Sequence, residues 1–362
     1  MTSVPELAWF SALCDDDYEF LGVPDERLRS SWEHCRGIAL RAEEAGFDNL
    51  LLPSGYALGI DNTAFAAAIA QVTQRMRMLL AIRCGELVVP QLARQVATID
   101  QMLGGRLTVN IISSDVPGET LESEPRYRRS TEIMHVLREL LNGEGVEFHG
   151  DFVDITIDPP RARTVSGACP PYYFGGLSEA ARECAARGAD VYLMWPDTVE
   201  GVTGVVDDMS KRAAAFGRSL KFGWRSHVVV RETEDEARAA ARRLLSRLDD
   251  AEGRKIRERS LDSASAGVAR QAELREGADD EGYAERHLWT GVGRARSGAG
   301  AAIVGDPDQV AAHLTALSEA GIDAFILSGY PHVTECDLFA RYVLPQLEHG
   351  PLDVAPQPVA VA

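Results

Sequence analysis

Short apolar segments alternate with longer helical patterns along most of this 362-residue chain. Apolar runs such as Asn49 to Pro53, Leu107 to Ile112 and Val191 to Met194 have the length and continuous hydrophobicity of strands buried on both faces. Stretches between them, such as 25–45 and 91–102, repeat apolar residues at helical spacing. Buried strands separated by helices predict a parallel sheet that is covered by helices.

Eight such strand–helix units can be counted along the chain. The expected strands are residues 8–10, 49–53, 76–82, 107–112, 172–174, 191–194, 221–230 and 324–327. Eight units favour a closed (β/α)₈ barrel, the TIM barrel, over an open doubly wound sheet, which stays as the alternative. We expect one α/β barrel domain over residues 1–352, with insertions.

Three segments do not follow this alternation of strands and helices. Residues 143–170 are rich in Gly and Pro and could hold a hairpin of 146–148 against 152–154. Residues 249–290, between the seventh and eighth strands, are highly charged and are interpreted as a mobile lid. A solvated helical excursion is the alternative for this insertion. The Pro- and Ala-rich tail at 353–362 is expected to be disordered.

The charge balance limits the kind of partner. Lys and Arg number 37 and Asp and Glu 55, which gives a net charge of −18. Such a chain repels nucleic acid and anionic membranes, so an anionic ligand needs a local cationic pocket. Six scattered cysteines show no metal-binding spacing, and no leader or membrane span is apparent. We expect free thiols, no metal site and a cytoplasmic location.

Two cationic side chains in the seventh strand are candidates for the site. Arg225 and His227 are two residues apart, so they point to the same side of the strand. If Val228 and Val230 face the helices, both cations face the barrel interior. An arginine inside a barrel is unfavourable unless it meets an anion. That anion could be a substrate, or a barrel carboxylate in a structural ion pair.

Two glycine-rich segments are further candidates. Phe174 to Ser178 joins a strand to a helix N-terminus, where glycines allow close approach of a ligand and Ser178 could cap the helix or bind phosphate. The segment lacks the dinucleotide-binding spacing. Gly291 to Gly300 contains Arg294 and Arg296 and could fold over an anion. A flexible exposed loop with solvated arginines is the alternative for it.

Five segments taken together resemble the bacterial-luciferase-like flavin monooxygenases, and within them the alkanesulfonate monooxygenases. They are Leu92 to Asp100 (LARQVATID), Tyr172 to Ser178 (YYFGGLS), Phe222 to Ala237 (FGWRSHVVVRETEDEA), Leu288 to Gly305 (LWTGVGRARSGAGAAIVG) and Leu327 to His332 (LSGYPH). The resemblance implies a two-component enzyme that uses O₂ and reduced FMN supplied by a separate NAD(P)H-dependent flavin reductase. It also implies a homo-oligomer, either a dimer or a dimer of dimers.

The resemblance also assigns residues to roles. The substrate-binding set is Trp195, Arg225, His227, Arg296 and Tyr330, with His332 beside them after the eighth strand. Arg225, His227 and Arg296 are the catalytic candidates, although an ordinary arginine is a poor base, and His227 or the activated oxygen itself could take the proton. The flavin-binding set, whose last three members lie near the phosphate, is Asn110, Tyr127, Gly176, Leu177 and Ser178.

The implied reaction oxygenates the carbon that bears a sulfonate, and the product collapses to an aldehyde and sulfite. The alkanesulfonate enzymes carry a cysteine after strand two, where this chain reads Ser54 to Asp61, and the loop Cys14 to Glu19 is more acidic. A sugar needs such hydrogen-bond acceptors, whereas an alkyl chain needs apolar walls. Three segments, WFSALCDDDYEFLGVPD, LLPSGYALGID and VNIISSDVPGE, resemble the branch that acts on sulfoquinovose (6-deoxy-6-sulfo-D-glucose), which would give 6-oxo-glucose.

Three alternative functions stay open at this point. The substrate could be a simple alkyl sulfonate. The chain could also be a flavin- or deazaflavin-dependent reductase on the same fold, which would not need the Arg and His cluster. A non-catalytic barrel that binds flavin or another anion is the third alternative.

Overall fold

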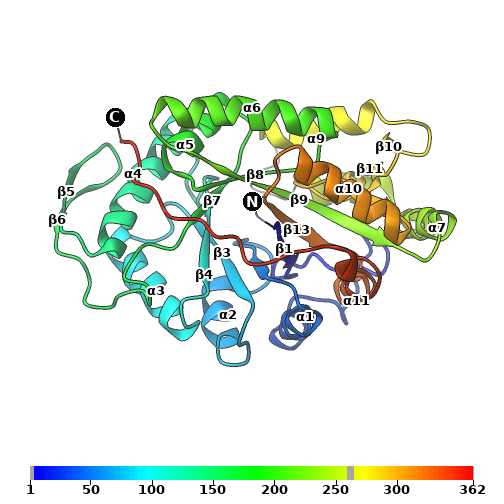
Figure 1. Cartoon of the computed structure of the whole chain (residues 1–362), viewed down its shortest axis with the longest axis horizontal. Helices are drawn as coiled ribbons and strands as arrows, with labels where there is room; N and C mark the ends of the chain where they lie inside the picture. Colours follow the sequence, from blue (N-terminus) through cyan, green and yellow to red (C-terminus); the bar gives the residue numbers. More distant parts are fainter. Residues whose placement is uncertain (1–3, 259–264, 362) are drawn as a thin grey trace.

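The computed structural model describes residues 4–258 and 265–361. Eight parallel strands pair in sequence order, and the last pairs back onto the first, so that the sheet closes into a barrel (Figure 1). This confirms the TIM barrel and excludes the open sheet. The barrel strands are β1 (Glu6–Phe10), β2 (Asn49–Leu52), β3 (Arg77–Arg83), β4 (Leu107–Ile112), β7 (Tyr172–Phe174), β8 (Val191–Met194), β9 (Lys221–Val230) and β13 (Ala324–Ser328).

Helices surround the barrel, and side-chain caps fix where several of them begin. Ser31, Asp61 and Thr198 each accept a hydrogen bond from a backbone N–H in the first turn of the following helix. The cap at Ser31 explains why the helix expected over 25–45 begins only at Trp32. The outer helices are α1 (Trp32–Ala45), α2 (Asn62–Ile69), α3 (Val89–Met102), α4 (Ser123–Asn142), α5 (Glu179–Gly188), α6 (Val199–Ala215), α7 (Glu234–Leu245), α10 (Pro307–Glu319) and α11 (His332–Tyr342).

Side chains of the barrel strands alternate between two apolar layers. Val228 and Val230 of β9 pack in the large core between strands and helices. Ile326 of β13 belongs to a smaller apolar cluster inside the barrel. At the end of the barrel where β1 starts, the Glu6 carboxylate accepts hydrogen bonds from Tyr173 (3.0 Å) and Asn49 (3.2 Å). The barrel interior is therefore filled at this end, and a ligand is expected at the opposite end, where the strands finish.

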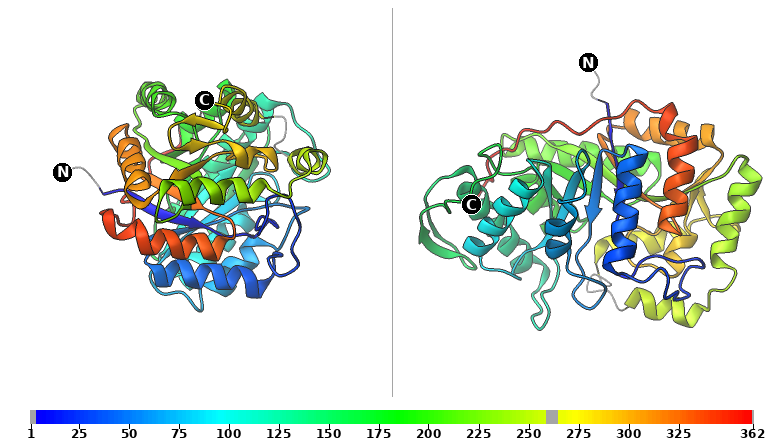
Figure 2. Two further views of the ribbon diagram at one scale, coloured as in Figure 1. Left: turned by 90° about the vertical axis from the view of Figure 1, so that its right-hand side faces the viewer. Right: turned by 90° about the horizontal axis from the view of Figure 1, so that it is seen from below.

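The C-terminal tail crosses the end of the barrel where the strands begin (Figures 1 and 2). Leu352 is buried inside the barrel mouth, and its N–H donates to Glu6 Oε2 (3.1 Å). Farther along, the Gln357 N–H donates to Asp190 Oδ1 (3.0 Å), and Arg218 Nε donates to the Pro358 carbonyl (2.9 Å). Residues 353–361 are thus packed along the barrel in this structure, although their composition favoured disorder, because buried polar side chains bind their backbone.

Under this tail lies a buried ion cluster that carries a stability prediction. The Asp190 carboxylate lies 2.6 Å from Arg138 and 3.4 Å from Arg218, and all three side chains are almost fully buried. Asp190→Asn would leave two buried guanidinium groups without a counter-charge, so we expect a loss of about 3–5 kcal/mol in unfolding free energy. Urea denaturation measures it, with Glu252→Gln in the exposed Lys255–Glu252 pair as the control that should change nothing measurable. Equal stability of Asp190→Asn and the wild type would contradict this account.

The insertion at 143–170 forms the expected hairpin with a different second strand. β5 (Val146–His149) pairs with β6 (Asp154–Ile157), which begins two residues later than expected. The reason is the turn, in which the N–H groups of Phe152 and Val153 donate to the Glu132 carboxylate of α4 (2.8 and 2.9 Å). Residues held this way are unavailable for strand pairing.

The charged insertion after β9 has more structure than the sequence indicated. It contains α8 (Asp250–Glu258), α9 (Ala266–Glu276) and two short strands, β10 (Tyr283–Glu285) and β11 (Leu288–Trp289). β11 pairs with β12 (Ala302–Gly305), which in turn pairs with the second half of β9. These strands were missed because two or three residues give no periodic signal. The expected lid at 249–290 falls partly on residues 259–264, which lie outside the described residues, and its mobility stays a prediction.

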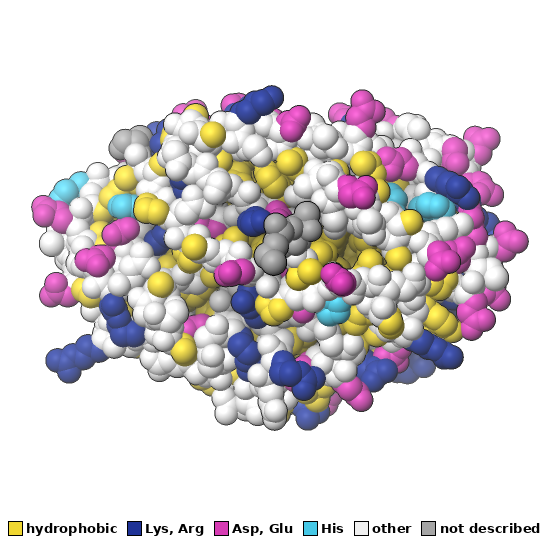
Figure 3. Space-filling model, viewed as in Figure 1, with side chains coloured by type: hydrophobic (Ala, Val, Ile, Leu, Met, Phe, Trp, Pro, Cys, Tyr) yellow, Lys and Arg dark blue, Asp and Glu magenta, His cyan; other side chains and the backbone are white. Residues whose placement is uncertain are grey.

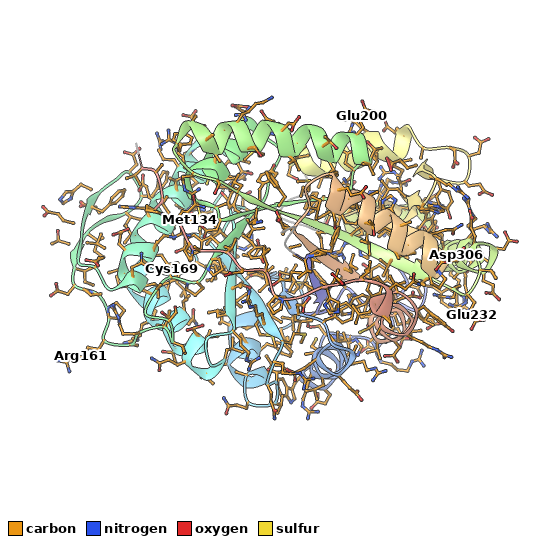
Figure 4. All side chains as sticks on the ribbon, in the orientation of Figure 1. Met134, Arg161, Cys169, Glu200, Glu232 and Asp306 are labelled. Atoms are coloured by element: carbon orange, nitrogen blue, oxygen red, sulfur yellow. The ribbon has the colours of Figure 1, made fainter. Side chains whose placement is uncertain are left out.

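The surface reflects the acidic composition. Figure 3 shows Asp and Glu side chains gathered over α7 and α10 at one edge of the molecule. Glu232 and Asp306 lie at that edge (Figure 4), where Asp306 caps α10 at the end of the β12–β9 pairing. All six cysteines are free thiols, as predicted. No helix in the described ranges is long and apolar enough to cross a membrane.

Candidate active site

Two adjoining cavities open where the barrel strands end. The first has a volume of about 400 Å³ and the second about 280 Å³. They share four lining residues, Asn110, Ile112, Leu193 and Trp195. Ligands in the two cavities would therefore lie on either side of this shared wall.

The first cavity contains the whole set that was predicted to bind flavin. It is lined by Asn110, Tyr127, Gly176, Leu177 and Ser178. Gly176 has a φ of +152°, and a Cβ atom there would lie 2.7 Å from the Ala181 side chain. A Cβ atom on Gly175 would lie 2.1 Å from the Leu193 carbonyl oxygen. Only glycines allow this loop to lie so close to β8 and α5.

The loop leads into the N-terminus of α5, which suits an anionic group. Ser178 caps this helix by accepting a hydrogen bond from the Ala181 N–H (3.3 Å). Backbone N–H groups and the helix dipole favour negative charge at such a terminus. Arg126 lines the same cavity, and one nitrogen of its guanidinium group lies 3.2 Å from Asp115. A glycine cradle, a helix N-terminus and a nearby guanidinium group together fit the phosphate of FMN.

The second cavity holds a buried guanidinium group without a counter-ion. Arg225 is 3% exposed, donates to Ser328 Oγ (2.8 Å) and to the Ser226 carbonyl, and lies over the Phe10 ring (4.3 Å). In the part of the chain that the structure describes, no carboxylate lies within ion-pair distance of it. Burial lowers its pKa to about 10, which still leaves it protonated at neutral pH. The alternative of a structural ion pair is therefore not what this structure contains.

Arg296 reaches the same cavity from the glycine-rich segment that follows β11. It forms an ion pair with Asp16 and donates to the Tyr330 hydroxyl (2.9 Å). Its Nε is buried and has no hydrogen-bond partner among the described residues. Arg296 thus differs from Arg225, because the Asp16 carboxylate already neutralises its charge.

His227 and Tyr330 lie behind the cavity wall rather than on it. His227 Nδ1 lies 3.3 Å from the Ala301 carbonyl and Nε2 lies 3.2 Å from the Tyr330 hydroxyl, so the partners assign the proton to Nδ1. Burial, followed by the nearby Arg225, holds the His227 pKa well below its ordinary value. The Tyr330 hydroxyl also donates to Asp16 (2.7 Å). The neutral imidazole of His227 thus competes with Asp16 for the hydroxyl proton of Tyr330. Such an arrangement of His227, Tyr330 and Asp16 allows a proton to move among the three groups.

Trp195 forms part of the wall between the two cavities. A Cβ atom on Gly267 of α9 would lie 2.7 Å from its ring, and one on Gly298 would lie 3.4 Å away. The two glycines therefore leave the space in which the indole packs. Gln271 of α9 ties the same region together, because it donates to the Pro196 carbonyl (2.7 Å) and accepts from the Gly300 N–H (3.0 Å).

Two residues show where reasoning from the sequence fell short. His332 does not line either cavity, because its ring nitrogens face the carbonyls of Phe10 (3.0 Å) and Asp16 (2.8 Å). Arg83 was not singled out, yet it lines the second cavity and its side chain is 4% exposed. Arg83 is the last residue of β3, and extending the expected strand by one residue would have placed it at the functional end.

Comparison with known proteins gives relatives over nearly the whole chain. Residues 20–324 match the family described as luciferase-like monooxygenase. A sulfoquinovose monooxygenase from Novosphingobium aromaticivorans is 64% identical, covering 96% of this chain and 98% of its own. One from Agrobacterium fabrum is 50% identical, covering 95% and 90%. The crystal structure of riboflavin lyase with modified FMN and riboflavin superimposes with a TM-score of 0.78 at 16% identity, covering 98% and 94%.

Proposed function

Because this chain belongs to the luciferase-like monooxygenase family, a family of flavin-dependent oxidoreductases, we propose that it desulfonates sulfoquinovose with O₂ and reduced FMN. The products are sulfite and 6-oxo-glucose. Relatives at 64% and 50% identity that carry the name sulfoquinovose monooxygenase support this substrate. We further propose that a separate NAD(P)H-dependent reductase supplies the reduced flavin, and that the enzyme is a cytoplasmic homo-oligomer.

The observation that carries the proposal is the uncompensated Arg225 guanidinium beside a cavity that suits a flavin. A sulfonate is anionic at physiological pH, and its oxygens match the donor fork of arginine. Bound there, the sulfonate supplies the counter-charge that Arg225 lacks in the described part of the protein. The shared wall at Asn110 and Trp195 then brings the adjacent carbon next to the first cavity.

The reaction balances with one flavin, one O₂ and one sulfonate. A reduced flavin supplies the two electrons that activate O₂ when it is bound. One oxygen atom replaces a hydrogen on the carbon that bears the sulfonate, and the other leaves as water. The C–S bond then breaks with its electron pair going to sulfite, while the new hydroxyl loses its proton and becomes the carbonyl.

During this reaction, residues of the chain stabilise negative charge and limit the entry of water. Negative charge grows on the sulfur group as sulfite leaves, and a buried guanidinium stabilises that charge more strongly than water does. Because its pKa is held well below the ordinary value, His227 stays neutral and orients the Tyr330 hydroxyl behind the cavity wall. α8 and α9 cover the cavities with Ile256 and Gly267, and they would limit the entry of water.

A sulfite assay tests the proposal. The protein, a flavin reductase, FMN, NADH and O₂ are combined with sulfoquinovose or with alkyl sulfonates, and released sulfite is measured. We expect sulfite from sulfoquinovose at a far higher kcat/KM than from alkyl sulfonates. Efficient release from alkyl sulfonates alone would favour the alkanesulfonate alternative, and no sulfite from any of them would exclude the proposed reaction.

Arg296 carries a prediction on the substrate side. Arg296→Ala removes the side chain that Asp16 and Tyr330 hold at the second cavity, which the first cavity does not share. We expect kcat/KM for the sulfonate to fall by roughly 10²-fold, while the Kd of FMN changes little. Steady-state kinetics and a flavin fluorescence titration measure the two effects. Equal losses in both would show that Arg296 acts on the flavin.

A further inference from the structure

We propose that Asp15 is a specificity-determining residue, whose carboxylate accepts a hydrogen bond from a hydroxyl of the substrate while Arg225 alone holds the sulfonate. This inference rests on the proposed function and adds the orientation of the substrate in the second cavity. It also separates the roles of the two arginines that were predicted together, because Arg296 then binds the hydroxylated body and not the anionic group.

The charges around the second cavity place the sulfonate. Three guanidinium groups line it, from Arg83, Arg225 and Arg296. Arg296 is paired with Asp16, and Arg83 Nε lies 3.1 Å from Glu86 Oε1. Of these three groups, only Arg225 has no carboxylate partner among the described residues. One added negative charge is therefore most stable beside Arg225. A second anion at Arg296 would have to displace Asp16.

Asp15 is fixed at the wall of this cavity with one oxygen available. Its Oδ1 accepts a hydrogen bond from the Ser30 N–H (2.7 Å), and no hydrogen bond to its other oxygen comes from the residues that the structure describes. Its φ of +50° lies in the left-handed region, which is unfavourable for most residues other than glycine and is best tolerated by Asp and Asn. Such strain is commonly kept where function requires one side-chain direction.

The cavity also contains donors that a hydroxyl oxygen could satisfy. Arg83 and Arg296 both line the cavity, and each guanidinium group has more N–H donors than its carboxylate partner uses. A hydroxyl group donates to a carboxylate and accepts from a guanidinium at the same time. A polyhydroxylated sulfonate therefore satisfies Asp15 and these donors together, whereas an alkyl chain would leave them desolvated and unpaired.

Asp15→Asn isolates this role, because the amide keeps the acceptor for Ser30 and tolerates the left-handed backbone. The Kd values of sulfoquinovose and of 1-hexanesulfonate are measured by calorimetry, without O₂ and with reduced FMN present. We expect the Kd of sulfoquinovose to rise by roughly 10- to 100-fold and that of hexanesulfonate to rise by far less. Glu19→Gln is the matched control, since it removes one negative charge from the same loop at a residue that pairs with Arg243 outside the cavity.

The outcomes separate the inference from the function on which it rests. Equal changes for the two ligands, or no change for sulfoquinovose, would overturn the role of Asp15 even if the wild type releases sulfite. A selective loss of sulfoquinovose binding supports that role without any turnover being measured. Failure of the wild type to release sulfite is a separate result, which counts against the proposed reaction alone.

Discussion

Arg225→Met is expected to slow sulfite release strongly while leaving the protein at least as stable as the wild type. The loss in kcat/KM should reach roughly 10²–10³-fold, because the side chain supplies the counter-charge for the sulfonate and for the sulfite that leaves. The gain in unfolding free energy should be about 1 kcal/mol or more, because methionine fills the buried space without an uncompensated charge.

The two effects have opposite signs because the guanidinium is buried without a carboxylate partner in the described structure. A residue kept for stability would show the reverse, since breaking a buried ion pair destabilises a protein strongly. Urea denaturation and the sulfite assay, carried out on the same preparation, measure both effects. Arg225→Lys is the matched control, because it keeps the charge, loses the planar fork and should retain part of the activity. Destabilisation of Arg225→Met by several kcal/mol would show that Arg225 serves the fold.

Ser178→Asp is expected to weaken FMN binding by roughly 100-fold, through repulsion between the new carboxylate and the phosphate. The helix itself should tolerate the change, because Asp caps an N-terminus as well as Ser does. Ser178 is the cap of α5 and lines the first cavity, so the added charge would face the place where a phosphate fits.

Riboflavin and Ser178→Asn supply the controls for this prediction. Riboflavin has no phosphate, so its Kd should be nearly the same for Ser178→Asp and the wild type. Ser178→Asn caps the helix without a charge and should bind FMN almost normally. Flavin fluorescence titrations measure all of these values. If Ser178→Asp lost riboflavin as severely as FMN, the phosphate would lie elsewhere or the variant would be misfolded, and its circular dichroism spectrum distinguishes the two.

The barrel could be predicted from the sequence because its strands are buried on both faces and its helices are amphipathic. Two- and three-residue strands such as β11 and β10 could not, since their pairing depends on β12 and β9. The tail after Leu352 was also beyond sequence reasoning. Its order comes from buried residues such as Asp190 and Arg218, which are far from it in the chain.

The functional site was likewise predictable only in part. Strand alternation predicted that Arg225 and His227 would point into the barrel. The resemblance identified five residues that line the first cavity. The pairing of Arg296 with Asp16 was not predictable, because the two residues are brought together only by the closed barrel and the insertion after β9. That pairing matters most for function, since it leaves Arg225 as the uncompensated cation among the described residues of the second cavity.

A crystal structure with FMN and sulfoquinovose would show where the sulfonate binds. We expect its oxygens to lie within hydrogen-bonding distance of Arg225. The flavin phosphate should lie at the N-terminus of α5, and the carbon that bears the sulfonate should face the flavin across the wall formed by Asn110 and Trp195. A sulfonate bound away from Arg225, with that guanidinium still lacking an anion, would contradict this prediction.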